Sequence, residues 1–137
     1  MIKKILSKSR IIQFLMIFVG VSGCFSVLFG AWLAHGGQAL PLNVQSTLNT
    51  ALQYQLFHTL ALFVTLVWAV TNSTGKVSSR VLLGAAIGFF VGIMCFSGTI
   101  YIKTFFSVTF IGKLTPFGGI SLAIAWLLLS IEGKNNL

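Results

Sequence analysis

Seven polar residues of this largely apolar chain have side chains that could bind a ligand or take part in a reaction. They include histidines, which can carry a proton, bind a metal or act as a base, and a serine that a base could turn into a nucleophile. The set is His35, Tyr54, Gln55, His58, Ser97, Tyr101 and Thr115. Three kinds of chemistry therefore have to be weighed: metal binding, nucleophilic catalysis and proton transfer.

Metal binding and catalysis both lack the groups that they need. A metal site takes three or more convergent nitrogen, sulfur or carboxylate ligands, whereas this chain has two histidines, one acidic residue and two cysteines placed elsewhere. Hydrolysis by Ser97 would need a histidine that an acid orients, and Glu132, the one acid, lies at the end of the last apolar run. We predict no catalytic residue, no metal, no cofactor and no enzymatic activity.

Proton transfer is chemically reasonable because histidine titrates near neutral pH. Driven transport, however, usually places a charged residue inside the membrane or uses paired broken helices. The sequence displays neither feature. Two roles for the polar residues stay open: hydrogen bonding between helices, and binding of a small ligand or a proton.

The composition places these residues in a membrane protein. Of the 137 residues, 56% are hydrophobic and 7% are charged, and the mean hydropathy is +0.98, which leaves too little polar surface for a soluble globule. The net charge of +8 does not indicate nucleic-acid binding, because the cations are spread between apolar runs and form no basic face. We expect one domain, residues 1–137, embedded in the lipid bilayer.

Four apolar runs are long enough to cross a bilayer, for which about 20 helical residues suffice. They are residues 11–35, 51–71, 81–102 and 115–131. Because no water inside the bilayer can satisfy peptide groups, each run must close its own hydrogen bonds as a helix. The runs also lack the polar and apolar alternation of a membrane barrel. The sequence predicts an all-α bundle of four transmembrane helices.

The cations predict the orientation of this bundle. Seven of them lie on one side of the predicted spans: Lys3, Lys4, Lys8, Arg10, Lys76, Arg80 and Lys134. Only Lys103 and Lys113 lie on the other side. Since short loops rich in Lys and Arg stay in the cytoplasm, we expect both termini to be cytoplasmic and residues 36–50 and 103–114 to face outward.

The first run also resembles a secretory signal, because Val21-Ser22-Gly23-Cys24 follows a basic start and an apolar stretch, as in a lipoprotein cleavage box. The apolar run nevertheless continues past Cys24 to Leu33. We therefore expect an uncleaved span, while lipidation of Cys24 stays open. Cys24 and Cys95 are expected at different depths, as two buried thiols and not a disulfide.

Two stripes of small residues predict close helix packing, on which association in lipid depends. The third run carries Gly84, Gly88 and Gly92, and the first carries Ser22, Ser26, Gly30 and Ala34, all at four-residue spacing. We expect the stripes to face neighbouring helices, with each other as one candidate pairing. Packing within one chain and packing between copies, in a homo-oligomer, both stay open.

The polar residues gather toward one predicted side. Tyr54 and His58 share a helical face with Gln55 beside it, and Ser97 and Tyr101 lie one turn apart. With His35 and Thr115 they predict a polar cluster near the outer face, with both imidazoles and the Tyr101 phenol at matching heights. We also expect the second helix to extend back over residues 42–50, with Asn43 as its cap.

Four segments of the chain resemble the signature segments of the domain-of-unknown-function 423 family of small bacterial inner-membrane proteins. They are Gly30-Ala31-Trp32-Leu33-Ala34-His35, Thr50-Ala51-Leu52-Gln53-Tyr54-Gln55-Leu56-Phe57-His58, Phe96-Ser97-Gly98-Thr99-Ile100-Tyr101 and Thr115-Pro116-Phe117-Gly118-Gly119. The resemblance covers about residues 15–130, in order. It implies four helices and a multi-pass location in the inner membrane, and it implies no activity.

The chain departs from the family pattern at several positions. Trp32 and Leu33 replace a Phe and a Gly, Thr59 replaces the Ala that follows the second histidine, and Ala125 replaces a Gly before Trp126. The larger side chains at 32 and 33 put close packing beside His35 in question.

Two functions follow from these expectations. The first is a structural or interaction protein of the inner membrane, acting through a membrane-protein partner or as an oligomer, for which His58→Leu should lower stability. The second is a small binding or transport module for a lipid headgroup, a small solute or a proton, for which a cavity lined by His35 and His58 should open outward.

Overall fold

The computed structural model describes residues 2–71 and 78–136, with side chains for residues 10–71 and 80–134. Helices make up most of this part of the chain, and it contains no strand. The α-helices are α1 (Ile2–His35), α2 (Leu42–Thr71), α3 (Ser78–Ile93), α4 (Thr99–Phe106) and α5 (Thr115–Asn136). Shorter turns are the 3₁₀ helices η1 (Gly36–Ala39) and η3 (Phe110–Leu114) and the π-helical turn η2 (Met94–Gly98).

These helices form four segments that are long and apolar enough to cross a membrane. The segments are Arg10–Ala39, Leu42–Thr71, Arg80–Phe106 and Phe110–Lys134. The third contains α3, η2 and α4, which follow one another without a break. The prediction of an all-α protein with four spans is confirmed. The physical reason is that lipid offers backbone groups no other partner, so apolar runs of this length become helices.

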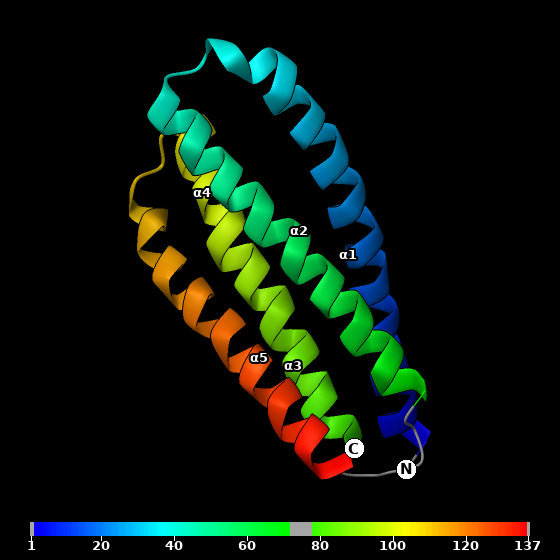
Figure 1. The fold of residues 1–137 in the computed structure, drawn as a ribbon. Coiled ribbons are helices and arrows are strands. Elements are labelled where there is room, and N and C mark those ends of the chain that lie inside the picture. The colour runs from blue at the N-terminus through cyan, green and yellow to red at the C-terminus, as the bar shows by residue number, and fades with distance from the viewer. Residues whose placement is uncertain (1, 72–77, 137) are drawn as a thin grey trace.

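The four segments run antiparallel (Figure 1). The rod of α3 and α4 contacts α2 on one side and α5 on the other, and α1 packs against α2. We call the end that holds η1 and η3 the loop end, and the end where α1 begins and α5 ends the terminal end. The cytoplasmic position of the terminal end stays a prediction, and Lys76, which supports it, lies outside the described residues.

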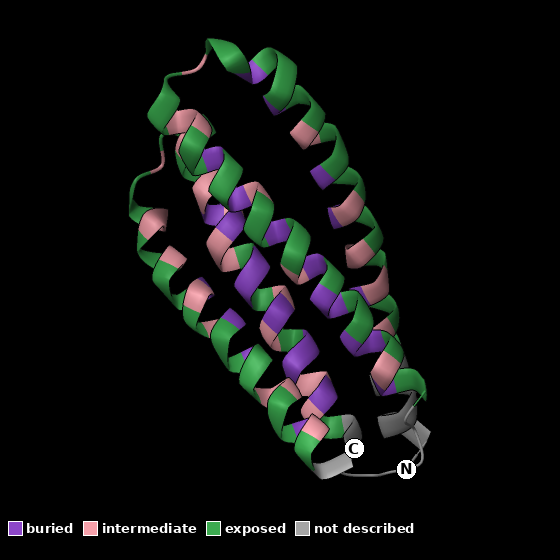
Figure 2. Ribbon diagram, viewed as in Figure 1, coloured by how far each residue is buried: buried purple, intermediate pink, exposed green. Residues whose placement is uncertain are grey.

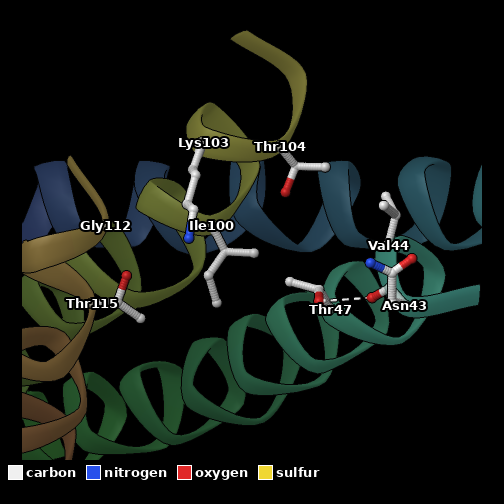
Figure 3. Close-up of a pocket in the computed structure, with 8 residues that line it drawn as sticks. All are labelled: Asn43, Val44, Thr47, Ile100, Lys103, Thr104, Gly112 and Thr115. Carbon is white, nitrogen blue, oxygen red and sulfur yellow. Dashed lines mark hydrogen bonds between the residues drawn. The ribbon is translucent and has the colours of Figure 1, made fainter. Parts of the chain in front are cut away.

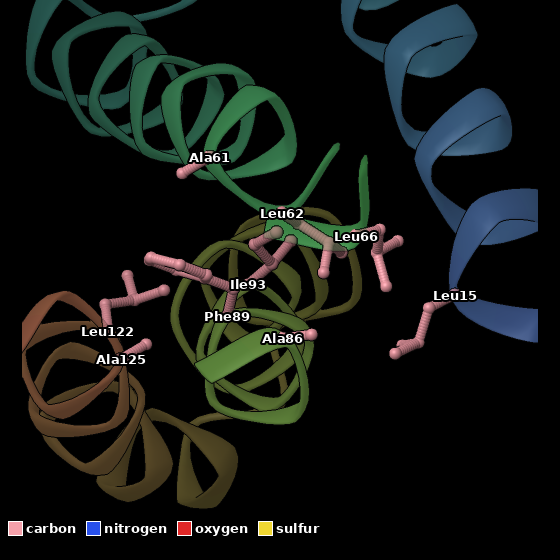
Figure 4. Packing of buried hydrophobic residues seen from close by; sticks show 9 residues of the cluster. All are labelled: Leu15, Ala61, Leu62, Leu66, Ala86, Phe89, Ile93, Leu122 and Ala125. Atoms are coloured by element: carbon pink, nitrogen blue, oxygen red, sulfur yellow. The ribbon is translucent and has the colours of Figure 1, made fainter. Parts of the chain in front are cut away.

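The core lies along the two central segments (Figure 2). In the most apolar window of each span, 39% of the residues are buried in α2 and in the α3–α4 rod, against 17% in α1 and α5. The central cluster is Leu15, Ala61, Leu62, Leu66, Ala86, Phe89, Ile93, Leu122 and Ala125 (Figure 4). Phe89 is fully buried between α2 and α5, so the middle of α3 organises the packing.

The glycine stripe of α3 faces α5. A Cβ atom built on Gly88 would lie 3.1 Å from the Cβ of Ala125, and one on Gly84 would lie 3.6 Å from the Cδ1 of Leu128. A Cβ on Gly92 would overlap the side chain of Leu122. The backbones of α3 and α5 therefore approach so closely that Gly92 in particular leaves no room for a side chain.

The small-residue stripe of α1 faces α2 instead. Ser22 and Ser26 are buried, and Ser22 bonds to α2 side chains, while a Cβ on Gly30 would lie 3.4 Å from the Cδ2 of Leu52. Ala34, the last member of the stripe, is exposed. The candidate pairing of the two stripes with each other is wrong, because helical spacing fixes which residues share a face but not which neighbour that face meets.

The loop end corrects the predicted cap. α2 begins at Leu42, as the expected extension requires, so Asn43 lies inside the first turn. The backbone carbonyl of Pro41 accepts the N–H groups of Val44 and Gln45 at 2.9 and 3.0 Å. The Gln45 side chain then donates to the Leu40 carbonyl at 2.7 Å, which fixes the turn between α1 and α2.

The two cysteines are both free thiols. α1 runs through Cys24 without interruption, and Cys24 points away from the bundle, whereas Cys95 is half-buried in η2. The expectation that both thiols are buried is therefore wrong for Cys24, which lies on the face of α1 turned away from α2.

Candidate functional site

A chain of hydrogen bonds joins α1, α2 and α4 in the interior of the bundle, and we call its four residues the buried polar network. The Oγ of Ser22 lies 2.7 Å from the Oγ1 of Thr59. The Nε2 of Gln55 donates to the Oγ of Ser22 at 3.0 Å. The hydroxyl of Tyr101 donates to the Oε1 of Gln55 at 2.9 Å. Three helices are tied together by these side chains alone.

Helical spacing brings the network together. Gln55 and Thr59 lie four residues apart and face α1 from one side of α2. Ser22 and Ser26 have the same spacing on α1, and the Oγ of Ser26 donates to the Ser22 carbonyl at 2.8 Å. The Nε2 of Gln55 also donates to the Ser22 carbonyl, at 3.4 Å. Ser22 is thus the point at which α1 is held to α2.

Aromatic rings position the Tyr101 end of the network. The ring of Tyr101 meets those of Phe25 and Phe29 edge to face, with centroids 5.5 and 5.1 Å apart. Phe105 packs in the same way against Phe29, at 6.1 Å. Edge-to-face pairs hold a ring in a defined plane, so the α1 aromatics aim the Tyr101 hydroxyl at Gln55.

A cavity of about 220 Å³ adjoins the network, between α1 and the α3–α4 rod. Its lining residues are Phe18, Val21, Ser22, Phe25, Gln55, Ile93, Met94, Ser97, Gly98 and Tyr101. Most of the wall is apolar, and Val21 and Met94 at its edge are exposed on the outer surface of the bundle. The polar side chains in the wall already bond to other protein groups. The cavity therefore suits an apolar chain better than a reacting group.

Tyr54 and His58 lie on a different side of α2 from Gln55. The Nδ1 of His58 is 2.6 Å from the Tyr54 carbonyl oxygen, and because a carbonyl only accepts, Nδ1 carries the hydrogen. The His58 ring lies near Phe89 and Trp126, with centroids 6.0 and 6.2 Å away. Tyr54 stacks on Phe96 at 4.4 Å. These two residues pack against the α3 and α5 side of the bundle.

The two imidazoles do not meet, and the expectation that they lie at matching heights is wrong. His35 is the last residue of α1 and is exposed at the loop end. His58 lies about 24 Å along α2 from its first residue, Leu42, at about 1.5 Å per residue. Because α2 begins at Leu42, nine residues before the apolar run that starts at residue 51, His58 lies far below the loop end.

Ser97 and Thr115 form hydrogen bonds between helices that are separate from the buried polar network. The Oγ of Ser97 donates to the Ala51 carbonyl at 2.7 Å, which holds η2 to α2. The Oγ1 of Thr99 lies 2.6 Å from the Cys95 carbonyl and 2.8 Å from the Oγ1 of Thr115. The hydroxyl hydrogen of Thr99 goes to the carbonyl, so Thr115 is the donor to Thr99 and joins α5 to α4.

The predicted cluster is therefore divided among four separate sets of contacts, and His35 is exposed at the loop end. Gln55 and Tyr101 meet each other, while Ser97, Thr115 and the pair of Tyr54 and His58 each bond elsewhere. The network roles of Ser22 and Thr59 were not predicted from the sequence. A usable signal for Thr59 is its four-residue spacing from Gln55, because two polar residues on one face of a membrane helix need a partner.

A second cavity, of about 370 Å³, lies at the loop end (Figure 3). It is lined by Asn43, Val44, Thr47, Ile100, Lys103, Thr104, Gly112 and Thr115. Figure 3 shows the side chains of Lys103 and Thr104 directed from α4 toward the start of α2 and α5. Neither this cavity nor the first is lined by His35 or His58, so the binding hypothesis has no support in the form that places both imidazoles in the site.

The described part of the chain contains neither a cluster of metal-ligating side chains nor a serine that a histidine could activate. No group of three or more His, Cys, Asp and Glu side chains there is placed to hold a metal ion. The hydroxyl of Ser97 is engaged by a backbone carbonyl and not by an imidazole. The polar side chains form hydrogen bonds between helices, and two cavities adjoin them.

Known proteins that are similar to this chain are membrane proteins. The UPF0382 membrane protein of Haemophilus influenzae is 33% identical over 114 residues, which cover 82% of this chain and 86% of that protein. The UPF0382 membrane protein YwdK of Bacillus subtilis is 30% identical over 112 residues, or 81% and 88% of the two chains. The UPF0382 inner membrane protein YgdD of Escherichia coli is 28% identical over 120 residues, or 87% and 88%. No solved structure matches the chain.

The family model described as "Protein of unknown function (DUF423)" matches residues 29–119. This range contains all four segments on which the resemblance was based, from Gly30 to Gly119. Four candidate spans and relatives that are membrane proteins, one of them named for the inner membrane, confirm the predicted multi-pass membrane location. The chain belongs to the DUF423 family.

Proposed function

We propose that this chain is a structural or interaction component of the bacterial inner membrane and not an enzyme. It would act through contacts with another membrane protein or with a second copy of itself. Its buried polar residues serve to hold four helices in one arrangement, and its outer surface makes the contacts.

The observation that supports this proposal is that the buried polar side chains are all hydrogen-bonded within the described part of the chain. An enzyme or carrier needs polar groups that converge on a cavity and remain free for a substrate, and the buried polar network leaves none of its own side chains free for one. Here Gln55, which is 6% exposed, uses both its donor and its acceptor groups on α1 and α4. Fully satisfied networks of this kind rigidify a core.

The surface of α1 supports the interaction part of the proposal. Cβ atoms built on Gly20 and Gly23 would meet nothing within 4 Å, and Cys24 beside them is exposed. A second helix can approach such a surface closely, which is how helices associate in lipid. The exposed thiol of Cys24 also provides a probe for that contact.

Replacing Gln55 by leucine tests the structural role. We expect Gln55→Leu to lower the free energy of unfolding by about 1–2 kcal/mol, because the half-buried Tyr101 hydroxyl loses its acceptor. The matched control is Gln53→Leu, an exposed amide two residues away on the same helix, which should have little effect. Thermal unfolding in a mild detergent measures both. A Gln55→Leu protein that unfolds like wild type but loses a small molecule seen by native mass spectrometry would contradict the proposal.

Oxidative cross-linking tests the interaction role. In native membranes, copper phenanthroline should link Cys24 to a second copy or to a partner, and Cys24→Ser should abolish the product. Cys95→Ser is the matched control and should leave the product in place, since that thiol is half-buried within the chain. Monomeric protein under all cross-linking conditions would contradict a contact at this face.

A further inference from the structure

We propose that the loop-end cavity binds a phosphate group, supplied either by a phospholipid headgroup or by free phosphate. The cavity lies between the first turns of α2 and α5 and the last turns of α4. This site is separate from the buried polar network and does not depend on the function proposed above. Three of its lining residues differ from those of the network in one respect: the protein does not use their side-chain hydrogen-bond donors.

Three donors line the cavity without a partner in the described part of the chain. They are the ammonium group of Lys103, the hydroxyl of Thr104 and the side-chain amide of Asn43. The other hydroxyls in the wall are engaged, since Thr47 donates to the Asn43 carbonyl at 2.8 Å and Thr115 bonds to Thr99. Figure 3 shows the Thr104 oxygen and the Lys103 nitrogen turned into the same space. Unengaged donors that converge on one space, with no acidic side chain among the lining residues, form a site for an anion.

The chain has no acidic side chain near Lys103, so an anion that neutralises this lysine has to come from outside the chain. Its one acidic residue, Glu132, lies 17 residues along α5 from Thr115, or about 25 Å at 1.5 Å per residue. No acidic side chain can therefore neutralise Lys103 within the chain. Residues of the first turns of α2 and α5 also line the cavity, and the positive ends of both helix dipoles add to the potential there.

The position of the cavity points to phosphate among the anions. Lys103 lies three residues before the end of the span Arg80–Phe106, so its ammonium group reaches the depth of the lipid headgroups, where lysine side chains extend. The Lys103 side chain runs across Gly112, where a Cβ would lie 3.4 Å from its Cδ. Lysine is a common ligand for phosphate. A volume of about 370 Å³ exceeds that of a single ion and leaves room for an ester substituent.

The test uses the full-length protein in an uncharged detergent at low ionic strength. Dihexanoyl phosphatidylglycerol is titrated and its binding followed by native mass spectrometry, with inorganic phosphate as the competitor. Lys103→Gln should weaken binding about tenfold, since a hydrogen bond to a charged group is worth that factor or more. Lys113→Gln, which changes an exposed lysine outside the cavity, should leave binding within about twofold of wild type.

A second pair of variants tests the geometry without changing charge. Thr104→Val removes a cavity hydroxyl that makes no hydrogen bond within the described chain and should weaken binding about threefold. Its control, Thr109→Val, lies outside the cavity and should bind like wild type. If inorganic phosphate fails to displace the lipid, the ligand is the headgroup; if it displaces the lipid, the ligand is the phosphate itself. Absence of binding by either probe, or wild-type affinity in Lys103→Gln, would overturn the proposal.

Discussion

Two contacts hold this bundle together by different means. Between α5 and the rod of α3 and η2 the helices pack closely at Gly88, Gly92 and Gly118, where added carbon atoms would meet protein atoms at 3.1 Å or less. Between α1 and α2 the helices are tied by side chains, with Ser22 bonded to Thr59 and Gln55. Lipid is as apolar as the helix surfaces, so association depends on packing in the first contact and on hydrogen bonds in the second.

Because the two contacts are made differently, we expect them to respond differently to substitution. At Gly118 the contacted atoms are backbone atoms of residues 95 and 96, so no side chain can move aside and one added methyl group displaces the whole helix. A hydrogen-bonded contact loses its bonds one at a time, and each is worth about 0.6 kcal/mol on average in a membrane interior. The first contact should therefore respond steeply to a small substitution, and the second in graded steps.

The largest effect is expected from Gly118→Ala. A Cβ at Gly118 would overlap the backbone nitrogen of Phe96 and lie 2.7 Å from the carbonyl carbon of Cys95, so α5 would have to move away from η2. Overpacking of this kind costs typically 1–3 kcal/mol, and we expect the upper part of that range because the contacted atoms are backbone. The unfolding midpoint in detergent measures the change.

The neighbouring glycine provides the control for this prediction. A Cβ at Gly119 would find its nearest contact 3.9 Å away, at the Cδ2 of Phe96, which is an ordinary distance. Gly119→Ala should therefore unfold like wild type or slightly later, because alanine favours the helix. Equal behaviour of Gly118→Ala and Gly119→Ala would show that α5 does not approach η2 this closely.

The sequence predicted the helices well because lipid leaves an apolar run no alternative. It also identified the small residues that pack, since four-residue spacing defines one face of a helix. It did not predict which helix each face would meet: Gly88 meets α5 and Ser22 meets α2. That choice depends on how four rods are rotated against one another, and local periodicity carries no information on rotation.

The candidate site was harder to predict for a related reason. Tyr54 and Gln55 are adjacent in sequence, yet one helical step of about 100° separates the α5 side of α2 from its α1 side. Both residues were predicted to belong to one polar cluster. In the structure, Tyr54 stacks on Phe96 and Gln55 bonds to Tyr101. The partnerless donors at Lys103 and Thr104 were not predicted, since only the fold shows which donors lack an acceptor.

A double-mutant cycle should sharpen the description of the polar contact. Gln55→Leu and Tyr101→Phe each remove one partner of the 2.9 Å hydrogen bond, and the double variant removes both. We expect a coupling energy of about 1 kcal/mol between them, because interhelical hydrogen bonds in membranes seldom exceed this by much. Unfolding free energies of the four proteins supply the cycle. A coupling near zero would mean that the ring of Tyr101 is held by Phe25 and Phe29 alone.

The smallest effect is expected from His58→Leu, which the sequence alone predicted to be destabilising. The Nδ1 of His58 bonds to the Tyr54 carbonyl of its own helix, and that carbonyl also accepts the backbone N–H of residue 58 in the regular helical pattern. Removing the imidazole therefore leaves no buried group without a partner, and leucine can pack against Phe89 and Trp126. The free energy of unfolding should change by less than about 0.5 kcal/mol, as in the control His35→Leu at the exposed end of α1. A loss above about 2 kcal/mol would show that His58 makes an interhelical bond, and the tie between α2 and α5 would then be polar as well as packed.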